Sequence, residues 1–300
     1  MARTELHLHL EGTVDRHTVM LLDPSVLPED VERAWAFTDF AGFLNCFKFV
    51  AQRLRGPADY ALIVRRMVDS LAAQEIDYAE VTLGAGVVLW RGFDFPSVWR
   101  AIREAQREAC SRTGVGIRWN LDAIRQFGPD HVMEVARMAA NYVGDGVISF
   151  GIGGDELRGP ASEFGAAYRY AKDAGLHLTA HAGETDGPDS IRAALAIGAE
   201  RIGHGIRAAD DPDLMRRLRE EDIPLEVCIT SNVRTGAVPS LDAHPVRKLF
   251  DAGVPITLNT DDPGLFETDL KREFQLAAAA FGFSKKELAL ISDNAGKYRF

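Results

Sequence analysis

The stretch Thr179-Ala-His-Ala-Gly-Glu184 lies at the end of a short apolar run and before a turn rich in Gly, Pro and Asp. This pattern predicts a buried strand over residues 176–181 that ends at His181, with Glu184 in the loop that follows. A metal-binding histidine followed by a carboxylate can activate a water molecule and move its proton. A strand-end histidine beside a solvated glutamate is the plainer explanation of this stretch alone. The other strand ends of the chain therefore decide between the two.

Short apolar segments of the same kind recur through the chain, with helical segments between them, as is typical of parallel strands buried on both faces. The expected strands are 4–10, 76–83, 115–121, 147–152, 176–181, 201–204, 224–229 and 255–259. The expected helices are 58–74, 97–112 (capped by Ser97), 129–142, 161–174, 189–197, 212–220, 245–252, 267–280 and 285–292. Strand–helix units in one run without a linker predict an α/β fold, a single (β/α)8 TIM-type barrel forming one domain over residues 1–300.

Residues 13–57 form a long connection after the first strand and predict a helical insertion. Phe40, Phe43, Leu44 and Phe47 recur at spacings of three and four residues, which indicates a helix with one apolar face. Core packing is the expected role of most such side chains. Because the segment is long for a connection, we expect part of it to form a lid over a pocket.

An open, doubly wound sheet is the alternative fold. That fold would carry a glycine-rich nucleotide-binding fingerprint after the first strand. The sequence there, His7-Leu-His-Leu-Glu-Gly12, is no such fingerprint, and Gly151-Ile-Gly-Gly-Asp-Glu156 matches one only loosely. The barrel is therefore favoured.

Composition narrows the classes of partner. The 300 residues are 46% hydrophobic and carry a net charge of −10, which suits a globular protein and disfavours binding to nucleic acid or to an anionic membrane. The sequence has no apolar run of the length that a membrane helix needs and no signal-peptide core at its start. Cys46, Cys110 and Cys228 are too few and too widely spaced for a disulfide framework or a zinc finger. These features predict a cytoplasmic protein.

The predicted strand ends carry an unusual share of the polar residues that can do chemistry. Since a barrel keeps its active site at the carboxyl ends of its strands, these side chains should meet at one mouth. Four of the 8 histidines and two carboxylates lie there: His7, His9, His181, His204, Asp261 and Asp262. A pair of core histidines is the competing explanation for the first two. The remaining histidines, to which no role is assigned, are His17, His131, His177 and His244.

Three imidazoles and a carboxylate suit a Zn²⁺ ion, and Fe²⁺, Co²⁺ or Mn²⁺ can use the same ligands. The expected ligands are His7, His9, His181 and Asp261. Water bound to such a cation loses a proton near pH 7, against a pKa of about 16 in bulk water. His204 could then orient the hydroxide, and Glu184 could take up the proton and deliver it to a substrate. No lysine ends the fourth strand to bridge two metals as a carbamate, so one ion per chain is expected.

Five motifs follow one another along the chain: His7-Leu-His-Leu-Glu-Gly12, Gly154-Asp-Glu156, His181-Ala-Gly-Glu184, Gly203-His-Gly205 and Asn259-Thr-Asp-Asp-Pro263. Together and in this order they resemble the adenosine deaminase family, a branch of the amidohydrolase-type barrels. The resemblance runs from about Thr4 to the C-terminus.

The resemblance implies a chemical role for each motif. It implies a zinc ion on the four expected ligands and a small-molecule 6-aminopurine as the substrate. Glu184 would donate a proton to purine N1, and His204 would position the hydroxide that attacks C6. Asp262 would meet N7, and the backbone N–H of Gly154 would meet N3. Ammonia would leave, and a 6-oxopurine would remain.

Three departures from the family bear on the substrate beyond the purine ring. Glu11 stands where typical members have an Asp that reaches the ribose. The insertion after the first strand is short for this family, and residues 82–91 lack the charged and aromatic pattern usual there. The expected substrate is a 6-aminopurine nucleoside, either adenosine or a 5′-modified adenosine. The apolar residues 87–90 suit an aromatic 5′ extension, and the Leu-Glu-Gly variant resembles deaminases of aminodeoxyfutalosine, a menaquinone precursor with a bulky 5′ group. Arg91 and Arg207 leave a nucleotide possible. Glu11 could instead only close a hydrogen bond in the barrel mouth.

Other activities compete with this interpretation. One is an adenine deaminase that acts on the free base, and another is a mononuclear amidohydrolase that cleaves a cyclic amide or ester. A non-catalytic binding protein is a further class, but it would need neither Glu184 nor His204.

Overall fold

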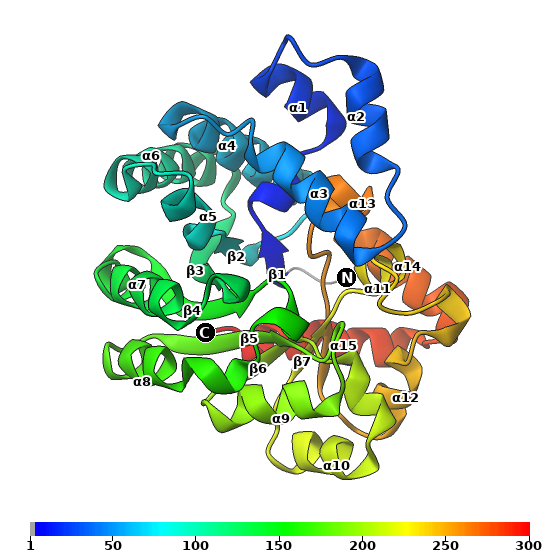
Figure 1. The fold of residues 1–300 in the computed structure, drawn as a ribbon. Helices are drawn as coiled ribbons and strands as arrows, with labels where there is room; N and C mark the ends of the chain where they lie inside the picture. The colour runs from blue at the N-terminus through cyan, green and yellow to red at the C-terminus, as the bar shows by residue number, and fades with distance from the viewer. Residues whose placement is uncertain (1–3) are drawn as a thin grey trace.

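The computed structural model describes residues 4–300, in which eight parallel strands form one sheet in chain order from β1 to β8 (Figure 1). Asp261, just beyond β8, pairs in parallel with Leu8 of β1. The N–H of His9 donates to the Asp261 carbonyl at 2.8 Å, which brings the last strand end against the first. This is the predicted (β/α)8 barrel. The strands are β1 Thr4–His9, β2 Tyr78–Leu83, β3 Gly116–Ile124, β4 Val147–Gly153, β5 His177–Ala182, β6 Arg201–His204, β7 Leu225–Val227 and β8 Ile256–Leu258.

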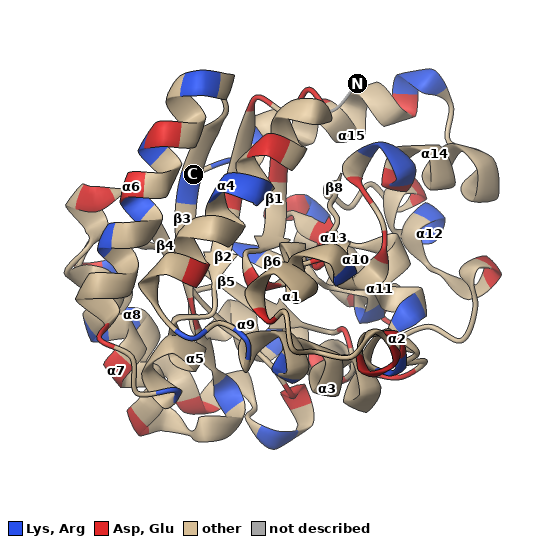
Figure 2. Cartoon of the chain, turned by 90° about the horizontal axis from the view of Figure 1, so that it is seen from above, with Lys and Arg blue, Asp and Glu red and all other residues tan. Residues whose placement is uncertain are grey.

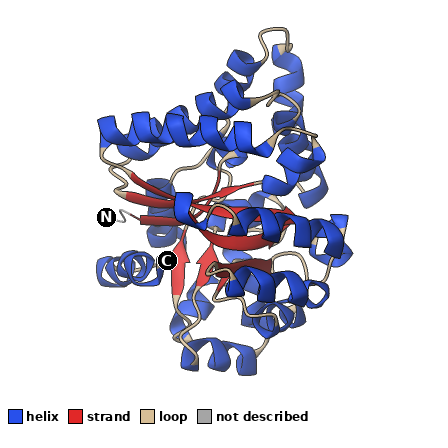
Figure 3. Ribbon diagram, turned by 90° about the vertical axis from the view of Figure 1, so that its left-hand side faces the viewer, coloured by secondary structure: helices blue, strands red, loops and turns tan. Residues whose placement is uncertain are grey.

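Helices surround the strands on all sides, as Figures 1 and 3 show. Between consecutive strands they are α4 Pro57–Ala73, α5 Ala85–Trp90, α6 Phe95–Thr113, α7 Pro129–Ala140, α8 Gly165–Asp173, α9 Pro188–Ala196, α10 Pro212–Glu220, α11 Ile229–Arg234 and α12 Val246–Asp251. After β8 come α13 Pro263–Phe266, α14 Leu270–Phe281 and α15 Lys285–Tyr298. The outer helices carry charges of both signs, as along α6 (Figure 2).

The strands separate an apolar layer from a polar barrel interior. In β1, Leu8 packs into the hydrophobic core, whereas His7 points the other way, to a carboxylate inside the barrel. The same alternation puts Glu80, Arg201 and Glu226 inside the barrel, each at most 3% exposed. Barrel interiors are usually filled by branched apolar residues, so this polar filling marks the place where function is expected.

The predicted helical insertion after β1 consists of α1 Arg16–Leu22, α2 Pro28–Trp35 and α3 Phe40–Ala51. Phe43 of α3 stacks on Phe266 of α13 at 5.1 Å between ring centroids, and Trp35 Nε1–H donates to the Gly264 carbonyl at 3.0 Å. The insertion is therefore attached to the segment that follows β8. Phe40, Phe43 and Phe47 of α3 also line a cavity. The insertion therefore both packs against the barrel and forms part of the cavity wall. Closure of this insertion as a lid stays a prediction.

Several predicted boundaries were wrong. The third strand continues to Ile124 instead of ending at residue 121. The seventh ends at Val227, and its expected last residue, Ile229, begins α11. An apolar run reads alike as a strand or as the first turn of a buried helix, which explains the second error.

Helix starts were displaced for a local reason. Asp94, not Ser97, caps α6, because the Asp94 carboxylate accepts the Ser97 backbone N–H at 3.1 Å. Asp269 caps α14 in the same way, so this helix begins at Leu270 and not at residue 267. In both helices the aspartate accepts the backbone N–H of the residue three positions after it. Aspartate caps a helix start as well as serine does. The helix expected from residue 161 begins as a short 3-10 segment, Ala161–Phe164, and α15 runs on to Tyr298.

All three cysteines are free thiols. Within residues 4–300, no helix combines the length and the apolar character that crossing a membrane requires.

Candidate active site

The four residues predicted as metal ligands meet at the mouth of the barrel. Their ligand atoms all lie within 4.8 Å of one another. His9 Nε2 lies 3.4 Å from His7 Nε2 and 3.1 Å from His181 Nε2. Asp261 Oδ1 lies 3.3 Å from the Nε2 atoms of both His7 and His9. We call these four residues the ligand set.

The hydrogen bonds of the Nδ1 atoms of His181 and His7 indicate which kind of ion the ligand set can bind. His181 Nδ1 lies 3.1 Å from the Ile152 carbonyl, which can only accept, so the proton is on Nδ1 and Nε2 presents a lone pair. His7 Nδ1 is held in the same way by a Glu226 carboxylate oxygen at 2.7 Å. Lone pairs that converge at about 3 Å repel one another unless a cation lies between them. Three imidazole nitrogens and one carboxylate oxygen, with supporting acceptors behind the rings, fit a divalent ion such as Zn²⁺.

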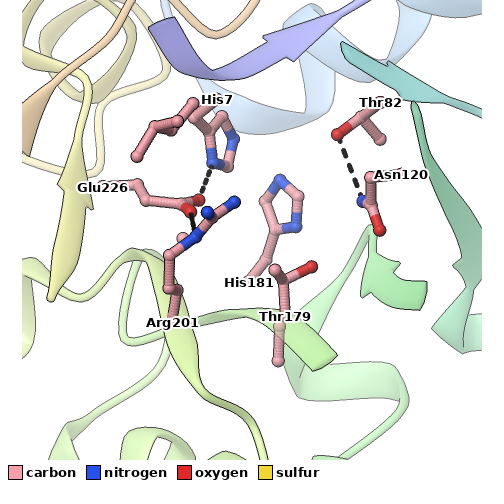
Figure 4. Close-up of a pocket in the computed structure, with 10 residues that line it drawn as sticks. His7, Thr82, Asn120, Thr179, His181, Arg201 and Glu226 are labelled. Carbon is pink, nitrogen blue, oxygen red and sulfur yellow. Dashed lines mark hydrogen bonds and ion pairs between the residues drawn. The ribbon is translucent and has the colours of Figure 1, made fainter. Parts of the chain in front are cut away.

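Figure 4 shows how the barrel interior supports His7. Arg201 of β6 reaches across the interior, and its Nε donates to Glu226 Oε1 at 2.6 Å while Nη2 donates to Glu80 Oε2 at 2.5 Å. The Glu226 carboxylate thus stands between Arg201 and His7. A side chain on Gly203 would put its Cβ 2.8 Å from His7 Cε1, so only glycine leaves room for this ring.

Burial and charge set the protonation of the site. Burial lowers the pKa of His9 and of His204 to about 4 and that of His181 well below its usual value, so these rings are neutral at pH 7. Burial also disfavours charge on His7, but its hydrogen bonds to Asp261 and Glu226 raise the pKa of His7 well above the ordinary value. A proton and a cation therefore compete for His7 Nε2. Burial opposes ionisation of Asp261, yet the hydrogen bond from His7 and the histidine charges hold its pKa well below normal.

Two residues of the site have strained backbones. His204 has φ 61° and Asp261 has φ 66°, in the left-handed region that costs non-glycine residues on the order of 1–3 kcal/mol. Both are buried and hydrogen-bonded, which keeps them in this conformation. Such strain is typical of sites that must aim a side chain.

Glu184 lies where the sequence predicts it, in the loop after β5. It is 5% exposed, and its Oε2 lies 3.6 Å from His204 Nε2. Burial, with repulsion from Asp261 and Glu156, raises the pKa of Glu184 well above its usual value. Burial therefore favours the protonated, neutral form of this side chain.

Asp262 lies beside the ligand set and is 2% exposed. Burial and the neighbouring Asp261 raise its pKa well above the usual value, and no group in residues 4–300 hydrogen-bonds its Oδ1. A Cβ on Gly12 would lie 1.9 Å from that oxygen, so glycine at this position makes room for the carboxyl group. This carboxyl oxygen is therefore free to form a hydrogen bond with a bound ligand.

Glu156 ends the motif Gly154-Asp-Glu156, but the sequence did not indicate what this side chain does. Its carboxylate accepts the backbone N–H groups of Gly183 and Glu184 at 2.8 Å and of Thr185 at 2.9 Å, and the Ser190 hydroxyl at 2.5 Å. Burial would raise its pKa, but these hydrogen bonds and Arg125 keep the pKa of Glu156 below the usual value. Glu156 is thus the anchor that fixes the loop carrying Glu184.

A cavity of about 440 Å³ opens beside the ligand set. Its lining includes Glu184, His204 and Asp262, together with Asp122, which sequence analysis missed because β3 was expected to end at residue 121. Burial raises the pKa of Asp122 to about 7. The rest of the lining is largely aromatic and apolar, and comes from α3, α5 and the segment after β3: Phe40, Phe43, Leu44, Phe47, Val87, Trp90 and Phe127.

Charged residues at the cavity differ from those expected. Arg91 and Arg207 do not line it, because their guanidinium groups donate to the carbonyls of Ala51 and Ala237. Lys48 and Arg158 do line it, and neither has an ion-pair partner in the part of the chain that the structure describes.

The two remaining candidates differ in their position. Gly154 lines the cavity with φ 99°. Glu11 is fully buried and does not line the cavity; its Oε2 accepts the Gly84 backbone N–H at 3.3 Å. Glu11 therefore joins the ends of β1 and β2 by a hydrogen bond, which is the alternative to a role in binding the ribose. Contact of either residue with a substrate stays a prediction.

A second possible ligand group consists of His204, Cys228 and Asp261. Burial raises the pKa of the Cys228 thiol well above its usual value, and its Sγ lies 3.5 Å from the Glu226 carbonyl. A protonated thiol is a poor ligand, so the three-histidine set is the better metal site.

The family model described as adenosine deaminase matches residues 2–300. The chain belongs to the adenosine deaminase family. It is 38% identical over 304 residues to an aminodeoxyfutalosine deaminase of Streptomyces coelicolor, with 98% of this chain and 79% of the relative covered. It is 36% identical over 300 residues to an adenine deaminase of Rhizobium johnstonii, with 98% and 93% covered.

A solved structure is similar throughout. The zinc-bound amidohydrolase from Burkholderia ambifaria matches with a TM-score of 0.92 and 27% identity, over 98% of this chain and 84% of that one. Membership of the adenosine deaminase family makes the chain a hydrolytic deaminase that acts on a C–N bond of a purine, and its fold implies a divalent metal.

Proposed function

We propose that the protein is a zinc-dependent deaminase of a 6-aminopurine nucleoside with a bulky 5′ substituent, such as aminodeoxyfutalosine. The observation that carries this proposal is a single cavity lined by two kinds of side chain. Glu184 lines it together with His9, His181 and Asp261 of the ligand set, and aromatic side chains make up another part of the lining.

His7, His9, His181 and Asp261 would hold the ion. A bound divalent ion supplies a water whose pKa falls from about 16 to near 7. The Burkholderia relative with bound zinc supports this choice of metal.

Glu184 would perform the proton transfers. Attack of an oxygen at C6 forms a C–O bond and pushes an electron pair onto N1, so an acid must stand ready there. Burial favours the protonated form of Glu184, so its carboxyl group can deliver a proton to N1 and accept one from the attacking oxygen. A proton passed to the amino group lets the C–N bond break and releases ammonia.

Asp262 and Gly154 would orient the ring. Purine N7 and N3 are acceptors and need donors. The raised pKa of Asp262 favours a proton on this carboxyl group, and in that form it would donate to N7. The backbone N–H of Gly154, at the cavity wall, can donate to N3.

The lining supports a nucleoside more than a free base. The volume of about 440 Å³ lies in the range of pockets for drug-sized ligands. Phe40, Phe47 and Phe127 offer aromatic faces on which a 5′ aryl group could pack. The name of the Streptomyces relative agrees with such a substrate. Adenine is the second candidate, because the Rhizobium relative is named for it.

The test compares kcat/KM for adenine, adenosine and aminodeoxyfutalosine with the metal-loaded protein. The proposal expects the 5′-extended nucleoside to lead. A preference for free adenine of tenfold or more, about 1.4 kcal/mol in transition-state binding, would refute the nucleoside substrate.

A further inference from the structure

Helix α11 places two consecutive polar side chains against the active site. Ser231 Oγ donates to Asp261 Oδ2 at 2.6 Å, and Asn232 Nδ2 lies 3.1 Å from His204 Nδ1. Ser231 is 1% exposed and Asn232 fully buried. None of the roles described above uses Asn232, which lies outside every helix and strand expected from the sequence.

Behind Asn232 lies His244, to which sequence analysis assigned no role. The backbone N–H of Val246 donates to His244 Nδ1 at 3.2 Å. Because a backbone N–H can only donate, His244 Nδ1 must accept. Burial lowers the pKa of His244 to about 3, so the ring is neutral. A neutral imidazole with a bare Nδ1 carries its proton on Nε2.

That proton determines the next two hydrogen bonds. His244 Nε2 lies 3.1 Å from Asn232 Oδ1, so the ring donates to the amide oxygen. The opposite orientation of the amide would set two N–H donors face to face in a buried place. Asn232 Nδ2 must then donate to His204 Nδ1. Since His204 accepts there, its own proton is on Nε2.

We propose that Asn232 and His244 are positioning residues that hold His204 in its Nε2–H tautomer. Its Nε2 lies 3.6 Å from Glu184 Oε2 and 3.9 Å from Asp261 Oδ2. The N–H is therefore aimed at the space between the acid and the ligand set.

The consequence for catalysis rests on the proposed function. If an oxygen attacks a purine from that space, His204 acts as a fixed hydrogen-bond donor that stabilises its negative charge. In this tautomer the ring has no lone pair on Nε2 with which to accept a proton. The proton transfers are then left to Glu184. The Val246 N–H, by donating to His244, sets the tautomer of His244 and, through Asn232, that of His204.

The tautomer can be observed directly in the zinc-loaded protein. Long-range ¹H–¹⁵N correlation spectra of protein labelled in its histidines distinguish a protonated from a bare ring nitrogen. We expect bare Nδ1 and protonated Nε2 in both His204 and His244. Protonated Nδ1 on His204 in the unsubstituted protein would overturn the inference. Because the spectrum needs no turnover, it decides this point even if no purine is deaminated, which would refute only the proposed function.

Two sets of variants test the chain of hydrogen bonds. Asn232→Asp offers His204 only an acceptor, so His204 should gain a proton on Nδ1 and kcat should fall about 10²-fold, the scale for losing one donor at a developing charge. The matched control is Asn294→Asp in α15, where the amide donates to the Ile256 carbonyl at 2.9 Å. The control should change neither the His204 signals nor kcat. Unchanged His204 signals in Asn232→Asp would contradict the inference.

The second set changes His244, the hydrogen-bond partner of Asn232, and serves if Asn232→Asp does not fold. His244→Gln keeps an N–H that can donate to Asn232 Oδ1, whereas His244→Leu removes it. We expect His244→Gln to retain the His204 tautomer and most of kcat, and His244→Leu to show both tautomers and a lower kcat with KM less affected. Identical spectra and rates for the two variants would overturn the proposal.

Discussion

Replacing Glu156 by Gln tests how the catalytic loop is held. The carboxylate accepts four hydrogen bonds, from the N–H groups of Gly183, Glu184 and Thr185 and from the Ser190 hydroxyl. Gln keeps only one acceptor oxygen, and its NH₂ group must face the donors of the other. If Oε1 keeps Glu184 and Thr185, the Gly183 N–H faces another donor, while the Ser190 hydroxyl can rotate to accept.

One buried backbone donor left unsatisfied costs about 1–3 kcal/mol, and the loss of charge weakens the remaining hydrogen bonds. We therefore expect the free energy of unfolding of Glu156→Gln to fall by about 1–3 kcal/mol. Because Glu184 loses its anchor, kcat should fall much more than stability alone implies; a displacement of about 1 Å can cost about 10²-fold.

The assay is steady-state deamination together with denaturant unfolding and metal analysis. Asp94→Ala is the control, since loss of this helix cap should cost about 1 kcal/mol at a residue that does not line the cavity, and should leave kcat unchanged. Glu156→Gln should keep its metal. A variant that loses stability yet retains full kcat would show that Glu156 does not hold Glu184 in place.

Three further sets of variants test individual parts of the site. Replacing any member of the ligand set by Ala should abolish both bound metal and turnover, and metal analysis that finds two ions per chain, or none in an active preparation, would contradict the single site. Gly203→Ala should weaken metal binding by displacing His7, whose Cε1 would lie 2.8 Å from the new Cβ; unchanged affinity in a chelator competition would show that the ring can move freely. Asp262→Ala should lower kcat/KM about 10- to 100-fold with the metal retained, whereas Asp262→Asn should keep more activity because an amide N–H can still donate to N7; the reverse order would mean that Asp262 acts as a carboxylate.

Strand ends were the most predictable part of the molecule. His7 and His9 alternate with leucines, and this period of two placed both rings on the interior face, where the structure has them. His181 and Glu184 were found in the same way. The fold class followed because each strand segment was separated from the next by a helical one.

Residues that support the site could not be predicted so easily. Strands β6 and β7 have four and three residues, too few for an alternation that would mark Arg201 and Glu226 as interior. Asp122 was missed because the third strand was expected to end at residue 121, before it. Asn232 and His244 are brought to His204 by a short helix and a turn, and only the folded chain shows that their hydrogen bonds connect.

Glu184 is proposed to move a proton during purine deamination at a metal site. Ammonia release should therefore be measured from the proposed nucleoside with the protein, with its Glu184→Gln variant, and with the protein treated with a chelator. We expect one ammonia per 6-oxopurine for the protein, and loss of activity in the chelator sample that returns with Zn²⁺. The variant should keep its metal and lose at least about 10²-fold in kcat. Near-normal turnover by metal-loaded Glu184→Gln would show that Glu184 does not carry the proton.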